Sequence, residues 1–191
     1  PSHPKAKLWA DKGLGQLMFQ LMSWSDEDGG WLEAPHYAMV SYDHMLASFI
    51  MSSRSGGGGY VHHSRVRKVA EWFAKISTPR DIRTGGLRHH PPIGNTYHGE
   101  NTGLFGIVAG LWKDLDPKFA ANMAWMHAEH GADNLGIGWS FPSMTGYKTM
   151  LAGGAIKPKR PAYGSSWFAK TGVVLRNTMG SDRETYLHLI A

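Results

Sequence analysis

The apolar pattern of the chain changes at Gly131, and this change limits the folds that the chain can adopt. Before Gly131, apolar residues recur every three or four positions, which is the spacing of helices with one buried face. After it, glycine and proline recur at short intervals up to Pro161, and two segments near the C-terminus are rich in strand-favouring residues. The pattern predicts an α+β chain, mainly α-helical at first and then antiparallel β.

Helices are expected over residues 14–22, 36–51, 65–76, 102–113 and 117–130. The first helical pattern extends back to Ala6, but Gly13 and Gly15 weaken it. Ser64 is the expected N-cap of the third helix, and Asp116 with Pro117 starts the fifth. Helices of this length joined by loops form antiparallel hairpins, which stack into a bundle, a solenoid or a toroid.

Three parts follow from this pattern: a helical domain over residues 1–150, a linker over 151–166, and the start of a β domain over 167–191. Strands are expected over 168–176 and 185–190, separated by turn-forming residues. We expect both ends of the chain to be cut points, because no signal peptide follows Pro1 and the last strand ends without a turn. Val173, Leu187 and Leu189 would then be exposed beside an unpaired edge.

Composition excludes several classes of protein. The chain has no cysteine, which rules out disulfides, zinc sites made of thiolates and thiol catalysis. The net charge of +5 is modest, and the tightest basic cluster is Lys157, Lys159 and Arg160, so nucleic acid is not an expected partner. No apolar run approaches the ~20 residues of a membrane span.

A first candidate site lies in residues 28–37, where a turn leads into the second helix. It contains an indole, a carboxylate, an imidazole and a phenol: Trp31, Glu33, His36 and Tyr37. The same residues also suit an ordinary helix start, in which Glu33 complements the helix dipole and Trp31 packs against the first turn.

A second candidate site is the loop over residues 88–100, which two prolines stiffen. Its polar residues are Arg88, His89, His90, Asn95, Tyr97, His98 and Glu100. Loops held by a rigid scaffold concentrate catalytic groups, which favours a functional interpretation over a solvated loop. His127 and His130 lack the zincin spacing, and Gly56 to Gly59 lack a phosphate-loop lysine. We therefore expect neither a metal nor a cofactor.

Three segments resemble the heparinase II/III-like polysaccharide lyases. Residues 29–37 (GGWLEAPHY) are similar to that family's Asp-Gly-x-x-x-Glu motif, and residues 91–97 (PPIGNTY) to its active-site loop, with Asn95 in place of the usual Asp. Residues 168–176 with Tyr186 and Leu187 resemble the entry to its β-sandwich. The resemblance covers residues 24–191 and implies the end of an incomplete α/α toroid, followed by an antiparallel β-sandwich.

The resemblance implies cleavage of a uronic-acid polysaccharide by β-elimination. This reaction needs a group that neutralises the uronate carboxylate, a base, and an acid for the leaving oxygen. The implied catalytic residues are Tyr97, His36 and His98, with His36 or Asn95 as the neutraliser. The implied substrate-binding residues are Trp31, Glu33, Tyr37, Arg88, His89, His90 and Asn95.

The family has an Asn or His shortly before the motif's Glu, where this chain has Gly30, Trp31 and Leu32. A second catalytic histidine of the family is expected beyond Ala191, so the chain should be catalytically incomplete. The resemblance also implies an acidic polysaccharide as partner and a periplasmic or secreted parent protein.

Two other functions remain open on the sequence. One is a glycoside hydrolase on a helical toroid, with Glu33 and Glu100 as acid and base. The other is a non-catalytic carbohydrate-binding or scaffold protein whose aromatic rings stack on sugars: Trp24, Trp31, Tyr37 and Tyr97.

Overall fold

The computed structural model describes residues 3–131 and 156–190, and in these ranges the chain is an α+β protein. The α-helices are α1 (Ala6–Trp24), α2 (Pro35–Arg54), α3 (Ser64–Ile76), α4 (Leu104–Trp112) and α5 (Pro117–Glu129). Two 3-10 helices, η1 (Tyr60–His62) and η2 (Ile82–Thr84), lie in the connections. The strands are β1 (Ser166–Phe168), β2 (Gly172–Asn177) and β3 (Thr185–Leu189).

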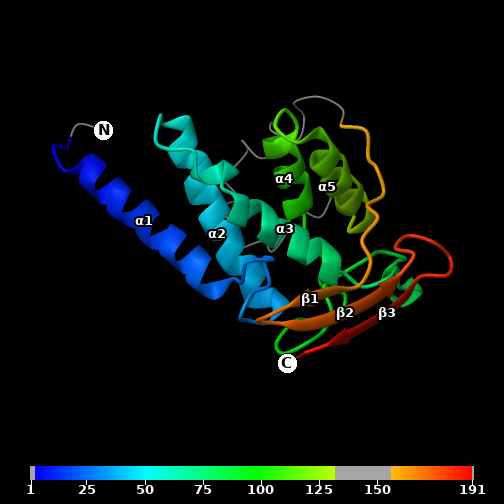
Figure 1. Cartoon of the computed structure of the whole chain (residues 1–191). Helices are drawn as coiled ribbons and strands as arrows, with labels where there is room; N and C mark the ends of the chain where they lie inside the picture. The colour runs from blue at the N-terminus through cyan, green and yellow to red at the C-terminus, as the bar shows by residue number, and fades with distance from the viewer. Residues whose placement is uncertain (1–2, 132–155, 191) are drawn as a thin grey trace.

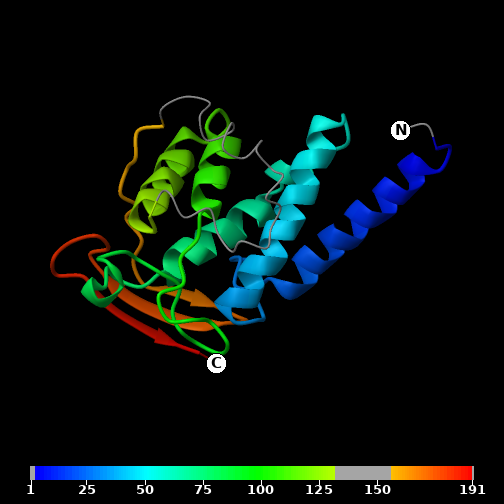
Figure 2. The ribbon, with the colours of Figure 1, turned by 180° about the vertical axis from the view of Figure 1, so that it is seen from behind.

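The helices form one layer, and the sheet lies across one end of it (Figure 1). The long connection between α3 and α4 runs beside the sheet, as the view from behind also shows (Figure 2). One continuous core joins the two layers, because Phe168 and Val174 of the sheet and Met179 of the turn after β2 belong to the same buried cluster as the helices. The boundary at residue 150 between the expected domains lies outside the described residues, and residues 156–165 of the expected linker form neither helix nor strand.

The predicted stripes of α2 and α3 form the centre of the core. In α2, all the residues assigned to the inner face are buried: Tyr42, Met45, Leu46, Phe49 and Ile50. In α3, Val66, Val69, Ala70 and Phe73 are buried as expected. Each fully buried side chain of this size contributes about 1.5–3 kcal/mol to folding. Periodicity alone was therefore sufficient to orient these two helices.

Capping fixes where α3 and α5 begin. The Asp116 carboxylate accepts a hydrogen bond from the backbone N–H of Phe119 at 2.9 Å, and Pro117 follows it, as predicted. In α3 the cap is His63 and not Ser64, because the His63 ring accepts from the backbone N–H of Arg65 at 3.1 Å. The predicted cap was wrong by one residue.

Helix α1 is longer than the predicted range and does not break at its glycines. It begins at Ala6 and continues through Gly13 and Gly15, but only Leu21 is buried. Met22, which was assigned to the inner face, is 44% exposed.

The strand expected over 168–176 is in fact two strands. The chain turns at residues 169–171, and Gly172 has a φ of 95°. A Cβ at Gly172 would lie 2.0 Å from the Leu189 carbonyl oxygen, so only glycine fits there. The sheet order is β1-β2-β3, and all pairs are antiparallel.

The sheet has one face on the helices and one face open. Phe168, Val174 and Arg176 face the helices and are buried. The opposite face carries Trp167, Leu175, Leu187 and Leu189, which are all exposed. Leu187 and Leu189 are exposed as predicted, and Val173 is half-buried. Within the described residues β3 pairs with β2 alone, so its other edge is unpaired.

Candidate functional site

Two segments that are distant in sequence meet at the start of α2. The backbone N–H of His36 donates a hydrogen bond to Thr96 Oγ1 at 3.2 Å. Gly94 has a φ of 58°, and a Cβ there would lie 2.7 Å from the Ala34 Cβ. The close approach therefore depends on glycine, and it brings the first candidate segment against the second.

Four side chains form a cluster at this junction, which we call the His36 cluster: His36, Tyr37, Tyr97 and Glu100. His36 Nδ1 lies 2.7 Å from Glu100 Oε1, and the two side chains are only 15% and 9% exposed. The ring centroid of His36 is 5.0 Å from that of Tyr97 and 5.2 Å from that of Tyr37. The second carboxylate oxygen of Glu100 accepts from the backbone N–H of Tyr97 at 3.2 Å.

The Glu100 carboxylate determines which nitrogen of His36 carries the proton. An ionised carboxylate only accepts hydrogen bonds, so Nδ1 must be the donor. Nε2 is then the nitrogen that is left to exchange a proton with a ligand. Glu100 was not among the predicted lyase residues; it was considered only as an acid or base of a hydrolase. Its position in the loop, three residues after Tyr97, was the available signal.

The two tyrosines give the cluster an aromatic surface. Tyr37 is 53% exposed and Tyr97 is 68% exposed. His98 and Asn95, in the same loop, are also exposed. The His98 ring lies 5.8 Å from the ring of His89, which is buried. These exposed groups are available to a ligand at the surface.

Three of the predicted substrate-binding residues instead lie inside the protein. Arg88, His89 and His90 are 1%, 4% and 0% exposed. Burial lowers the pKa of His90 to about 3, and the charges of His89 and His36 act in the same direction. The implied role of these residues in substrate binding is wrong, because all three are buried. His90 packs against Phe73 of α3, and Arg88 binds Glu129 of α5.

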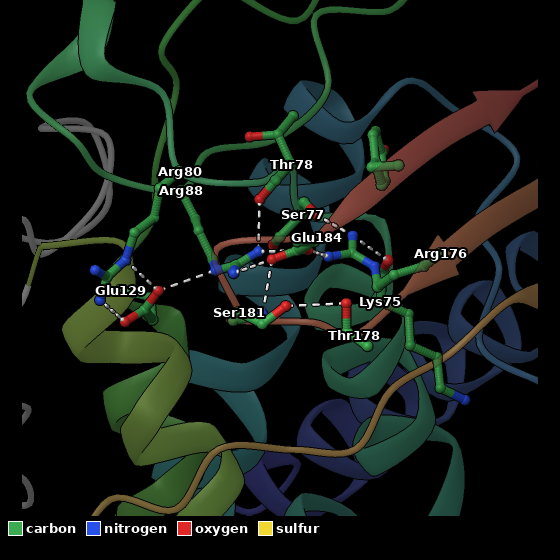
Figure 3. A network of polar contacts seen from close by, with 12 residues as sticks. Lys75, Ser77, Thr78, Arg80, Arg88, Glu129, Arg176, Thr178, Ser181 and Glu184 are labelled. Atoms are coloured by element: carbon green, nitrogen blue, oxygen red, sulfur yellow. Dashed lines mark hydrogen bonds and ion pairs between the residues drawn. The ribbon is translucent and has the colours of Figure 1, made fainter.

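Arg88 belongs to a buried network of charges that joins the loop, α5 and the sheet (Figure 3). Its Nε donates to Glu129 at 3.0 Å, and one terminal nitrogen donates to Glu184 at 3.0 Å and to the Thr78 carbonyl at 2.9 Å. Arg176 binds Glu184 from the other side, and Arg80 binds Glu129. Protein groups thus engage Arg88, which leaves it unable to take its implied role in substrate binding.

Trp31 and Glu33 also differ from their expected roles. Trp31 is 0% exposed, so it cannot form a stacking wall for a sugar. Its indole N–H donates to Glu33 Oε2 at 3.2 Å, which fixes the carboxylate beside it. Trp31 instead belongs to the buried core, where its ring lies edge-on to that of Trp24 with the centroids 6.2 Å apart.

A pocket of about 190 Å³ lies next to the His36 cluster and shares its two backbone segments. Its lining residues are Leu32, Glu33, Ala34, Pro35, Trp72, Ile93, Gly94, Lys170, Thr171, His188 and Ile190. Lys170 and His188 were not predicted as site residues, because they line this pocket only when the sheet packs against the helices. Burial lowers the pKa of His188, while the Thr171 backbone acts in the opposite direction.

No group of three or more His, Asp or Glu side chains within residues 3–131 and 156–190 is arranged to hold a metal ion. In the same ranges no helix combines the length and apolar character that crossing a membrane requires. Comparison with protein-family models, curated proteins and solved structures finds no match to this chain. The site must therefore be interpreted from its own chemistry.

Proposed function

We propose that this chain is part of a polysaccharide lyase of the heparinase II/III-like type, which cleaves a uronic-acid polysaccharide by β-elimination. The observation that carries the proposal is the His36–Glu100 contact of 2.7 Å with an exposed Tyr97 ring 5.0 Å from His36. This geometry supports the proposal because elimination needs a base and an acid within reach of one sugar ring. The helical layer would be the end of an α/α toroid, and the sheet the start of a β-sandwich.

The proposed reaction uses the two ring systems in sequence. His36 Nε2 removes the proton next to the uronate carboxylate, and the electron pair of that bond forms the carbon–carbon double bond. The bond to the glycosidic oxygen breaks, and the Tyr97 hydroxyl gives its proton to the departing oxygen. Glu100 stabilises the imidazolium, and Asn95 is the remaining exposed candidate to neutralise the uronate carboxylate.

The substrate in this proposal is an acidic polysaccharide or oligosaccharide. The parent protein would act on it in the periplasm or as a secreted protein. The exposed rings of Tyr37 and Tyr97 would stack on its sugar rings. Trp31 and Arg88 have no part in binding, because both are buried.

The test is the formation of unsaturated uronate, followed by its ultraviolet absorbance, in the full-length protein supplied with a panel of uronate polysaccharides. Tyr97→Phe should lower turnover by about 10²–10⁴-fold and leave substrate binding in place, because only a proton-transfer group is lost. Tyr60→Phe is the matched control, since Tyr60 packs on Phe49 away from the junction. Unchanged turnover in Tyr97→Phe would reject Tyr97 as the acid.

A non-catalytic sugar-binding protein is the second candidate, and the exposure of both tyrosine rings favours it. The same panel separates the two functions. Binding that Tyr37→Ala and Tyr97→Ala abolish, without unsaturated product or new reducing ends, would identify a binding protein. New reducing ends without the double bond would identify a hydrolase.

A further inference from the structure

One face of α1 carries an exposed apolar stripe. Leu8, Gly15, Phe19 and Met22 are separated by seven, four and three residues, which places them on one side of the helix. Leu8, Phe19 and Met22 are 50%, 65% and 44% exposed. A Cβ at Gly15 would meet nothing within 4 Å. We call these residues the α1 stripe; the helix packs on the core through a different face, with Leu14, Leu17 and Leu21.

The N-terminal half of α1 has little to stabilise it within its own chain. It projects from the rest of the molecule in both views (Figures 1 and 2). It has no side-chain cap and no acidic residue in its first turn. Lys5 and Lys7 stand at the positive end of the helix dipole, and the two glycines each cost about 1 kcal/mol. A helix of this kind frays unless it packs against a partner.

The charges at the two ends of α1 are complementary. Lys5, Lys7 and Lys12 are exposed near its start, where Lys7 also pairs with Asp11, while Glu27 and Asp28 are exposed just after its end. Two copies of the helix laid antiparallel would bring the lysines of one copy to the carboxylates of the other. The carboxylates would also approach the positive end of the helix dipole, which they stabilise.

We propose that α1 pairs antiparallel with α1 of a second copy of this chain, about a two-fold axis that passes beside Gly15. Leu8 and Met22 lie seven residues before and after Gly15, so each faces the other residue across the axis. Gly15 permits close approach at the crossing point, and Phe19 packs on the aliphatic stem of Lys12. This inference does not rest on the proposed function, and the two differ in what covers the stripe, because in a toroid preceding helices would pack there.

The size of the surface sets the strength of the pair. A helix of 19 residues is about 28 Å long, which offers less than the ~800 Å² per partner of a standard interface. The dimer should therefore dissociate on dilution. The outer face of the sheet is also apolar, but nothing on it indicates an occupant.

Cysteine cross-linking of the full chain tests the geometry, because the chain contains no cysteine of its own. Gly15→Cys should form a disulfide-linked dimer on mild oxidation, because the axis places the two thiols together. Leu8→Cys alone should form no disulfide-linked dimer, because Leu8 faces Met22 of the other copy, but it should cross-link when mixed with Met22→Cys. Self-linked Leu8→Cys would indicate a parallel pair and overturn the proposal.

Sedimentation equilibrium over a range of protein concentrations tests the surface. The unmodified chain should show a monomer–dimer equilibrium, and Phe19→Glu should be monomeric throughout. Trp167→Glu is the control, because it places the same charge on the other exposed apolar face. Lys5→Glu should weaken the dimer, and adding Asp28→Lys should restore it. A monomer at every concentration, or a dimer lost only in Trp167→Glu, would overturn the proposal.

Discussion

His90 shows how one buried side chain can make the stability of the whole protein depend on pH. Its imidazole is completely buried between the rings of Phe73 and His130, and neither ring nitrogen has a hydrogen-bond partner within the described residues. Burial lowers its pKa from 6.5 to about 3 and also lowers the pKa of His130. The unfolded chain therefore binds more protons than the folded one between these pH values. The contribution of His90 to the free energy of unfolding is complete above pH 6.5 and is lost as the pH falls toward 3.

His90→Phe should remove part of this acid sensitivity. One such imidazole accounts for about 2 kcal/mol of lost unfolding free energy between pH 7 and pH 5. Urea unfolding at the two pH values should show a smaller difference in the variant than in the unmodified chain. His44→Phe, at an exposed position on α2, should leave the difference unchanged. If the unfolding free energy falls by the same amount between pH 7 and pH 5 in His90→Phe and in the unmodified chain, His90 is not the source of the acid sensitivity.

At the scale of helices and strands, local signals and distant contacts differ in what they reveal. The sequence predicted α2, α3 and α5 because their stripes and the Asp116–Pro117 start are local features. It missed the break between β1 and β2, because residues 168–176 were predicted as one strand from their β-favouring residues, whereas the turn depends on the conformation of Gly172.

Gly172→Ala should destabilise the protein more than an ordinary glycine replacement. The new Cβ would meet the Leu189 carbonyl oxygen, so β3 would have to move away from β2. Gly56→Ala is the matched control: Gly56 has a φ of 76°, but a Cβ there meets nothing within 4 Å. The control should cost about 1–2 kcal/mol and Gly172→Ala at least about 2 kcal/mol more, by denaturant unfolding. Equal destabilisation by the two variants would show that the clash with the Leu189 carbonyl oxygen is relieved without loss of stability.

The same distinction explains what was predicted of the candidate site. Residues 28–37 and 88–100 could be named as candidate segments because each concentrates polar and aromatic groups in a local stretch of sequence. The inward direction of Arg88 could not be predicted, because it depends on Glu129 and Glu184, which lie 41 and 96 residues away in the chain. No local pattern could show which polar residues of the loop turn inward.

On the scale of the whole molecule, the buried charge network joins the sheet to the helices. Glu184 binds both Arg88 and Arg176, and all three side chains are at most 4% exposed. Gly180 also donates its backbone N–H to Glu184 at 2.7 Å. Removing this carboxylate leaves two guanidinium groups buried without it, which is much more costly than losing a surface ion pair.

Glu184→Ala should therefore lower the unfolding free energy by about 3–5 kcal/mol. Asp182→Ala, at an exposed position in the same turn, should change it by no more than about 0.5 kcal/mol. Chemical denaturation with circular dichroism measures both. A loss in Glu184→Ala as small as that in Asp182→Ala would show that the network contributes little to the docking of the sheet.

The docking of the sheet also has a consequence for the order of folding. The contacts that hold it join Asp26 to Lys170, Trp72 to Thr171 and Ile76 to Tyr186, across 144, 99 and 110 residues. Closing loops of this length costs entropy before any contact is gained, and folding slows as such contacts become more numerous. The helical hairpin of α4 and α5 needs only neighbours in the chain. We therefore expect the sheet to dock after the helices have formed the surface against which it packs.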